Sequence, residues 1–120
     1  MNYITASRKA IESQYDAICD IYEYGKVTKG NITKNHETSK GQAIPCRVSF
    51  EEIYANTETD TENKVVQKIK LFIKPELIIR PGSKIVVTRK NRVTSYKNSG
   101  EPAVYDTHQE IMLDNWKGWT

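Results

Sequence analysis

The sequence is poor in the features that mark disulfide-rich, secreted and membrane-spanning proteins. Its 120 residues include two cysteines, Cys19 and Cys46, and no Cys-x-x-Cys motif. Two cysteines do not make a secreted disulfide framework, and both lie in apolar strand-like patterns, where a free cysteine acts as a small buried hydrophobe. No apolar run is long enough to cross a bilayer, and the first residues lack the apolar stretch of a signal peptide. We therefore expect a soluble protein made in a reducing cytoplasm.

Catalytic motifs are lacking as well. There is no Gly-x-Ser-x-Gly elbow, and no glycine-rich loop precedes a helix to hold phosphate. The two histidines are His36, in a polar segment, and His108, which alternates with Asp106 and Glu110. Alternating polar residues on a strand usually form its solvated face, and no second His or Cys cluster completes a metal site. We expect no catalytic residue, no metal, no cofactor and no enzymatic activity.

Charge is distributed unevenly, although the net charge is only +3. Residues 64–97 contain ten Lys or Arg residues against the single acid Glu76, whereas residues 51–63 contain five acids and no base. Such polarity could serve nucleic acid or a complementary neighbour, or it could simply solvate exposed strand faces. The sequence leaves these alternatives open.

The hydropathy pattern predicts a mainly β fold, a small barrel or sandwich with one short amino-terminal helix in a single domain, residues 1–120. Apolar residues at helical spacing predict the helix over residues 3–15. About six antiparallel strands follow, over residues 16–28, 44–53, 64–74, 85–89 and, as a hairpin, 92–113. Long polar loops are expected at residues 29–42, with mobility there, and at residues 54–63. A carboxy-terminal tail spans residues 114–120.

The hairpin at residues 92–113 carries the sharpest local pattern. It is expected to turn at Asn98-Ser99-Gly100, with Pro102 at the start of its second strand. Period-two alternation then places a largely apolar set on one face of that strand. This set is Tyr105, Thr107, Gln109, Ile111 and Leu113.

One alternative function is a barrel-type module that binds single-stranded nucleic acid through the basic face of residues 64–97. The outer face of residues 64–74 offers Lys68, Lys70 and Lys74 around Phe72. Cationic strands with an exposed aromatic ring are how such modules follow phosphates and stack bases. One aromatic residue among lysines is also common on ordinary strands, so the pattern is not specific.

The order of several segments resembles the small head-closure proteins of long-tailed phages and of prophages of Gram-positive bacteria. These head–tail connector or stopper subunits are also described as minor capsid proteins. The resemblance covers nearly the whole chain and is weakest in residues 29–42 and 54–63, and no single motif in it is chemically specific. It is carried by MNYITASRKAIESQYDAICDIYEY at the start, by IPCRVSFEEI, and by PGSKIVVTRKNRVTSYKNSGEPAVYDTHQEIML.

The resemblance implies a virion protein that is in the host bacterial cytoplasm before assembly, and it leaves open whether the isolated protein is a monomer. It implies a homo-oligomeric ring of about twelve copies below the portal and adaptor proteins, closing the filled head and offering a docking surface to tail-completion proteins. Contact with packaged DNA would not read its sequence, and no membrane is involved. The expected assembly contacts are Lys34, His36, Glu58, Asp60, Glu62, Asn98, Ser99, Trp116 and Trp119, and the possible DNA-facing residues are Lys68, Lys70, Phe72 and Lys74.

Overall fold

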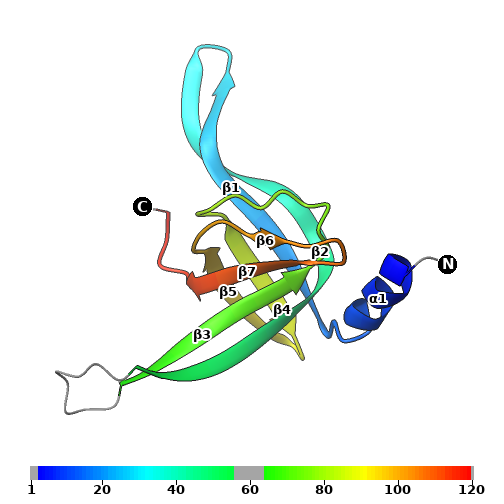
Figure 1. The fold of residues 1–120 in the computed structure, drawn as a ribbon. Helices are drawn as coiled ribbons and strands as arrows, with labels where there is room; N and C mark the ends of the chain where they lie inside the picture. The colour runs from blue at the N-terminus through cyan, green and yellow to red at the C-terminus, as the bar shows by residue number, and fades with distance from the viewer. Residues whose placement is uncertain (1–2, 56–63, 120) are drawn as a thin grey trace.

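The protein consists of one short helix and seven strands, in a computed structural model that describes residues 3–55 and 64–119 (Figure 1). All the strand pairs are antiparallel. The fold class is therefore confirmed as mainly β with one short amino-terminal helix. The elements are α1 (Tyr3–Glu12), β1 (Ala17–Lys29), β2 (Ile32–Ala55), β3 (Lys64–Ile73), β4 (Lys84–Arg89), β5 (Arg92–Asn98), β6 (Ala103–Val104) and β7 (Gln109–Asn115).

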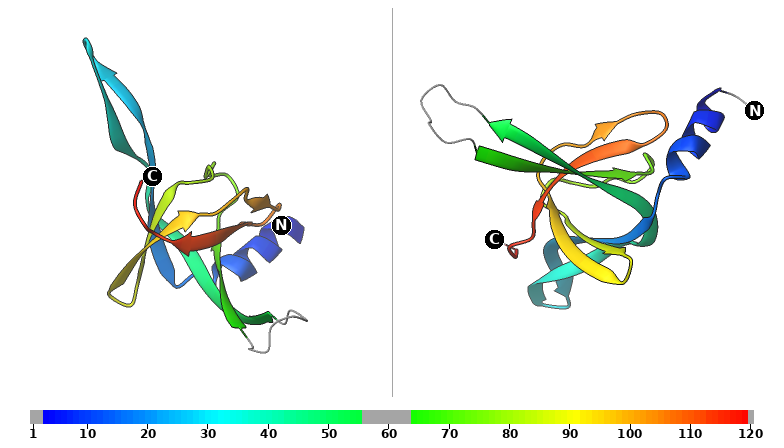
Figure 2. Two further views of the ribbon diagram at one scale, coloured as in Figure 1. Left: turned by 90° about the vertical axis from the view of Figure 1, so that its left-hand side faces the viewer. Right: turned by 90° about the horizontal axis from the view of Figure 1, so that it is seen from below.

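Six of the seven strands are hydrogen-bonded to one another in a closed ring. The order around the ring is β1–β2–β3–β7–β5–β4, and β4 pairs again with β1. Closure leaves no open sheet edge within the ring, which removes the usual site of unwanted strand pairing. Strand β6 pairs with Gln109 and Glu110 of β7, on the edge of β7 that β5 occupies further along. Figure 2 shows the ring from two further directions, with α1 beside it and two hairpins that extend away from it.

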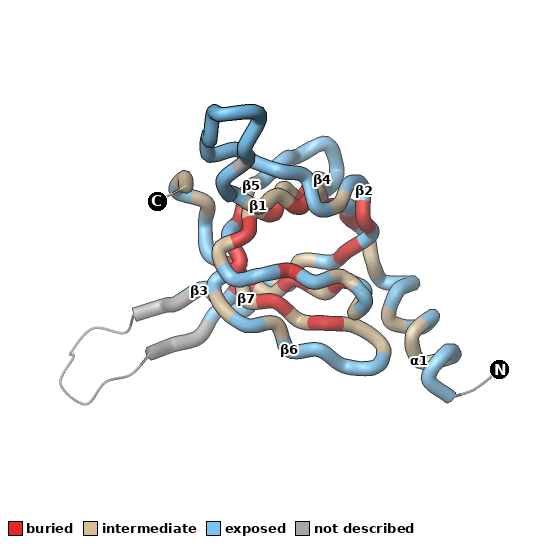
Figure 3. Tube along the Cα trace, turned by 90° about the horizontal axis from the view of Figure 1, so that it is seen from above, coloured by how far each residue is buried: buried red, intermediate tan, exposed pale blue. Residues whose placement is uncertain are grey.

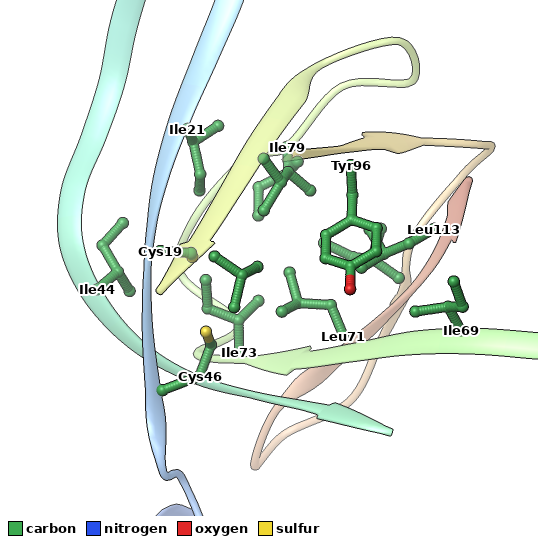
Figure 4. Close-up of a cluster of buried hydrophobic side chains, with 14 residues drawn as sticks. Cys19, Ile21, Ile44, Cys46, Ile69, Leu71, Ile73, Ile79, Tyr96 and Leu113 are labelled. Carbon is green, nitrogen blue, oxygen red and sulfur yellow. The ribbon is translucent and has the colours of Figure 1, made fainter. Parts of the chain in front are cut away.

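The inside of the ring is filled by aliphatic side chains from alternate positions of each strand, as the period of two requires. In β4 the buried positions are Ile85 and Val87, and in β3 they are Ile69, Leu71 and Ile73. Figure 3 shows the buried positions on the strands of the ring, and Figure 4 shows how their side chains meet inside it. The other core members are Ala17, Cys19, Ile21, Ile44, Cys46, Ile79, Tyr96, Ile111 and Leu113.

Both cysteines are free and buried in this core, as predicted. Ala17 pairs with Cys46 across β1 and β2, and Cys19 is the next inward-facing residue of β1. The contact with Cys46, together with burial, raises the pKa of the Cys19 thiol above its ordinary value. The Cys19 thiol therefore remains protonated, and both buried cysteines serve as small hydrophobes.

A turn at Lys90 and Asn91 closes the β4–β5 hairpin. Arg89 pairs with Arg92, which leaves two turn residues, with φ angles of 50° and 64°. Two positive φ angles are what a two-residue hairpin turn needs to match the twist of its strands. Asparagine tolerates this left-handed conformation better than most residues do.

The prediction of a polar loop at residues 29–42 is wrong. Residues 32–42 belong to β2, which pairs with β1 from Tyr24↔Glu37 as far as Lys29↔Ile32 around a turn at Gly30-Asn31. We call this two-stranded ribbon, residues 24–40, the arm. Its sequence is polar because neither of its faces is covered, and polar composition alone does not distinguish an uncovered strand pair from a loop.

An irregularity in the pairing separates the arm from the ring. The register between β1 and β2 shifts twice around Ile21, and Ala43 has a positive φ of 49°. The Ala43 amide donates a hydrogen bond of 2.8 Å to the Asp20 carboxylate, which satisfies a backbone group that the shifted pairing leaves free. Such bulges bend a strand. The arm therefore leaves the ring at a defined point (Figure 1).

The hairpin predicted over residues 92–113 is only partly correct. Its second half folds back on itself: β6 pairs with β7, and the Tyr105 amide donates to the His108 carbonyl at 2.8 Å. Strand β5 meets β7 only from Tyr96↔Asn115 to Asn98↔Leu113. Of the apolar face predicted for this stretch, Gln109, Ile111 and Leu113 are buried, whereas Tyr105 and Thr107 lie outside the core.

Two buried side-chain amides hold the irregular segment 74–83 across one end of the ring. Asn98 Nδ2 donates to the Ile79 and Arg80 carbonyls, both at 3.1 Å. Gln109 Nε2 donates to the Lys74 and Leu77 carbonyls at 2.9 and 2.8 Å. Each amide replaces the ladder bonds that an irregular segment cannot make, and this allows Ile79 to be buried in the core.

Replacing Asn98 with alanine is expected to lower the free energy of unfolding by about 2–4 kcal/mol, because two carbonyls lose their donor in a buried place. Urea denaturation followed by circular dichroism measures this change. Ser99→Ala is the matched control: Ser99 is exposed and donates a single bond to the Met112 carbonyl, so it should cost less than about 1 kcal/mol. Equal effects of the two substitutions would contradict the role assigned to Asn98.

Candidate assembly surfaces

The arm is uncovered over most of its length. Residues 28–40 are all exposed, among them the predicted contact residues Lys34 and His36, which pair with Val27 and Gly25 across the ribbon. At the foot of the arm, Lys84 Nζ lies 3.1 Å from Glu37 Oε1. Thr28 and Thr33 share a hydrogen bond of 3.0 Å near the tip. The arm thus presents a charged surface with few internal contacts to hold it.

The carboxy-terminal tail folds back onto the foot of the arm. The Trp119 ring stacks on Tyr24 with centroids 5.1 Å apart, and Trp116 meets Trp119 edge-on at 4.5 Å. Lys84 Nζ lies 5.2 Å from the Trp116 centroid, within the range of a cation–π contact. Both tryptophans, predicted as partner contacts, are therefore half-buried in an aromatic cluster that braces the arm.

The predicted DNA-facing residues of β3 do not form a uniform basic strip. Lys68 and Lys74 are exposed. Lys70 Nζ, however, lies 3.0 Å from the Glu110 carboxylate, and the Phe72 ring lies 5.8 Å from the ring of His108. Two of the four residues therefore already have partners within the chain.

Asp106, His108 and Glu110 were predicted to form one solvated strand face. This prediction needs correction, because the side chain of His108 is more enclosed than a solvated face allows. Asp106 is exposed in the turn before β7, whereas the His108 side chain is 15% exposed. His108 Nε2 lies 2.9 Å from Glu110 Oε2, and its ring stacks on Tyr105 at 5.0 Å. The described residues contain no group of three or more potential metal ligands.

The pKa of Glu110 is lowered from its ordinary value. The hydrogen bond with His108 is the main cause, the hydrogen bond and charge of Lys70 add to it, and partial burial opposes both. The deprotonated carboxylate is therefore favoured in the folded protein. It fixes the His108 ring and the Lys70 ammonium on the outer surface of β3 and β7.

The helix α1 stands beside the ring and buries none of its residues. It is held by Arg8, whose guanidinium makes paired hydrogen bonds to the Glu76 carboxylate and a further one to Glu12 at 2.6 Å. This pairing raises the pKa of Arg8 and lowers that of Glu76. Tyr3 and Ile4 remain exposed, so these two apolar residues of the helix are not covered by the ring.

The linker after α1 lies closer to the ring. Gln14 accepts a hydrogen bond from Arg47 at 2.7 Å, and Asp16 accepts one from Arg89 at 2.8 Å. The Tyr15 hydroxyl is enclosed without a hydrogen-bond partner among the described residues, and burial raises its pKa to about 12.

In the described part of the chain no helix is long and apolar enough to cross a membrane.

The remaining predicted contacts divide into three cases. Asn98 is buried and its amide is used inside the protein, so its side chain does not reach a partner surface. Ser99 is exposed beside it. Glu58, Asp60 and Glu62 lie outside the described residues. Tyr24, which carries the aromatic cluster, was not predicted, because its partner Trp119 is far away in sequence and no local pattern links the two.

Comparison with known proteins supports the fold. No protein-family model matches the chain, and no curated protein matches it. A solved structure, that of the phage-like element PBSX protein XkdH from Bacillus subtilis, is similar with a TM-score of 0.52 and 17% sequence identity. The match covers 82% of this chain and 93% of that one. At this level of identity the likeness shows a shared fold.

Glu110→Gln is expected to lower the free energy of unfolding at neutral pH by about 1 kcal/mol, since it removes a partly exposed carboxylate from His108 and Lys70. Because its folded pKa lies below the ordinary value of 4.5, the Glu110 contribution is complete above that pH. It is lost as the pH falls through the lower, folded value. The variant should therefore lose less stability than the parent on acidification.

Urea titrations at pH values on both sides of 4.5 test this prediction. Glu101→Gln, at an exposed glutamate without an ion pair in the described chain, is the matched control and should follow the parent curve. Identical acid profiles for the Glu110 variant and the parent would show that the carboxylate does not contribute as described.

Trp119→Ala should loosen the arm without unfolding the ring, because it removes the stack on Tyr24 while leaving the core intact. Hydrogen exchange of the amides in residues 24–40 should become several-fold faster, as expected when a contact worth roughly 1 kcal/mol is lost. Exchange in β3 and β4 should not change. Tyr105→Ala, which removes a stack on His108 outside the aromatic cluster, is the control and should leave arm exchange unaltered.

Proposed function

We propose that the chain is a non-enzymatic structural subunit of a phage connector. In this proposal it forms a homo-oligomeric ring below the portal, helps to retain packaged DNA and offers a docking surface for the tail. The observation that carries it is the combination of a closed, stable ring of strands with a long uncovered arm. The likeness to a protein of a phage-like element is consistent with it.

The arm is suited to contact a neighbouring molecule. An isolated two-stranded ribbon is marginally stable in water, since it has no core of its own. Beyond Tyr22, where β1 stops pairing with β4, both outer edges of the arm carry backbone groups without a strand partner. Such edges and the exposed Ile32 side chain, 60% accessible near the tip, are features that binding to another chain would cover.

The proposed partners are further copies of this chain, the portal or adaptor proteins, and tail-completion proteins. Contacts with packaged DNA would be made by exposed lysines such as Lys68 and Lys74, without reading its sequence. The surfaces described above hold charged and aromatic groups that are engaged with one another. This arrangement favours a structural role over catalysis.

The alternative, a module that binds single-stranded nucleic acid on its own, has less support. Its proposed stacking residue Phe72 is half-buried beside His108, and Lys70 is paired with Glu110. A free binder would shift single-stranded DNA at low salt, with an affinity that falls steeply as salt rises. A connector subunit would instead be encoded among portal, capsid and tail genes.

Shortening the arm should abolish assembly and preserve the fold. Deleting residues 26–29 and 32–35 joins Gly25 to His36 through the native Gly30-Asn31 turn and keeps the strand register, since Gly25 already pairs with His36. We expect a folded protein whose unfolding free energy lies within about 1 kcal/mol of the parent, because the removed residues contribute nothing to the core. It should fail to complement a phage that lacks the gene.

The measurement is the yield of infectious particles and of DNA-filled heads after complementation. The Trp119→Ala variant is a graded control, because it loosens the arm and keeps its sequence. Normal particle yield with the shortened arm would contradict the role of the arm. Normal head closure in the absence of the gene would contradict the proposed function itself.

A further inference from the structure

A cleft lies at one end of the ring between β2 and the β4–β5 hairpin. We call it the mouth; its volume is about 470 Å³. The inward faces of three strands continue into it from the core. Its floor is made by Val48, Val87 and Tyr96, and its rim by Phe50, Arg89, Lys90, Arg92 and Thr94.

The rim of the mouth is basic and only partly neutralised. Arg89 is paired with Asp16 at 2.8 Å. Neither Lys90 nor Arg92 forms an ion pair with any residue of the described chain, and both are exposed at the β4–β5 turn. Phe50, on the opposite rim, is 51% exposed although it continues the buried face of β2. An apolar floor beside unpaired cations fits a ligand that has apolar side chains next to carboxylates.

The chain itself contains a segment with this chemistry. Beyond the ring, β2 and β3 continue as a second projecting hairpin, paired only with each other as far as Ala55↔Lys64 (Figure 2). Glu51 and Glu52 are exposed on it. The sequence of residues 51–63, EEIYANTETDTEN, places two large apolar residues among five acids and contains no base.

We propose that the mouth of one subunit binds the acidic segment 51–63 of a second copy. In its own subunit the described start of this segment leads away from the mouth, since Ala55 lies five residues beyond Phe50, roughly 16 Å along an extended strand. Two different surfaces pair in this contact, so it is head-to-tail and can close into a ring. The inference rests on the proposed function, because it supplies the contact between subunits of the homo-oligomer.

A nucleic-acid strand is the less suitable occupant. Binding of single strands uses flat aromatic platforms spaced along a track of cations. The mouth has a floor that includes two valines, and its unpaired cations lie at one turn. It therefore fits one anchored, acidic peptide segment better than a run of stacked bases.

A charge exchange tests the proposal on the full chain. One variant carries K90E and R92E, which reverse the rim, and a second carries E58K, D60K and E62K, which reverse the segment. Neither variant should self-associate, because its rim and its segment carry charges of the same sign. An equimolar mixture should associate, because the reversed rim of the first variant meets the reversed segment of the second, and the native segment of the first meets the native rim of the second. Self-association is measured by sedimentation velocity in low salt. It should be at least tenfold weaker in each variant than in the parent, and the mixture of the two variants should associate like the parent.

The matched control carries K97E and K117E, two exposed lysines away from the mouth with the same change in charge. It should associate like the parent. Circular dichroism of each variant establishes that the fold is retained. Equal weakening by the control, or no restoration in the mixture, would overturn the proposal.

The position of the contact is tested with a synthetic peptide of residues 51–63 added to isotope-labelled parent protein. Amide shifts should concentrate on residues 48–50 and 87–96, and they should disappear with K90E and R92E. Shifts confined to another surface would overturn the proposal, as would tighter binding of an oligodeoxynucleotide at the same residues. If the charge-reversed variants still complement head closure, this inference fails while the connector function stands.

Discussion

The structure depends on how the end of the ring is closed by a segment that is neither helix nor strand. Residues 74–83 cross that end, and their carbonyls would be buried without partners if Asn98 and Gln109 did not donate to them. The side-chain amides of Asn98 and Gln109 thus allow Ile79 to be buried in the core, and they fix the path of the chain between β3 and β4. Both amides come from strands that meet at Asn98↔Leu113, so the same few residues close the ring and fill its end.

The strands of the ring could be predicted because burial on one face imposes a period of two, as in Ile69, Leu71 and Ile73. The arm could not, because that signal needs one covered face and the arm has none. The fold-back at residues 99–108 also escaped prediction, since Gln109, Ile111 and Leu113 alternate in the same way whether β7 pairs with β5 or with β6. Local patterns report burial and leave the choice of strand partner undetermined.

The surface contacts were harder to predict than the core for a related reason. Lys70 and Phe72 look like a basic, aromatic strip in sequence, and only the tertiary structure brings Glu110 and His108 against them. Trp119 and Tyr24 lie near opposite ends of the chain and meet because the tail crosses the foot of the arm. Asn98 was placed at an assembly surface because it occupies a turn-like Asn-Ser-Gly sequence, although its amide is needed inside.

The charge asymmetry of the sequence has a simple physical reading once the ring is known. Among the described residues, Glu51 and Glu52 are exposed on the projecting β2–β3 hairpin, whereas Lys90 and Arg92 are exposed without an ion pair at the β4–β5 turn. Unpaired cations kept together at one turn raise the free energy of the isolated subunit, which is the physical basis of the proposed contact with the acidic segment of a second copy. High salt weakens exposed pairs of this kind, whereas the apolar floor of the mouth, formed in part by Val48 and Val87, is insensitive to screening. The proposed contact is built from both components, so it would be weak between free subunits and would strengthen if a ring brought many copies together.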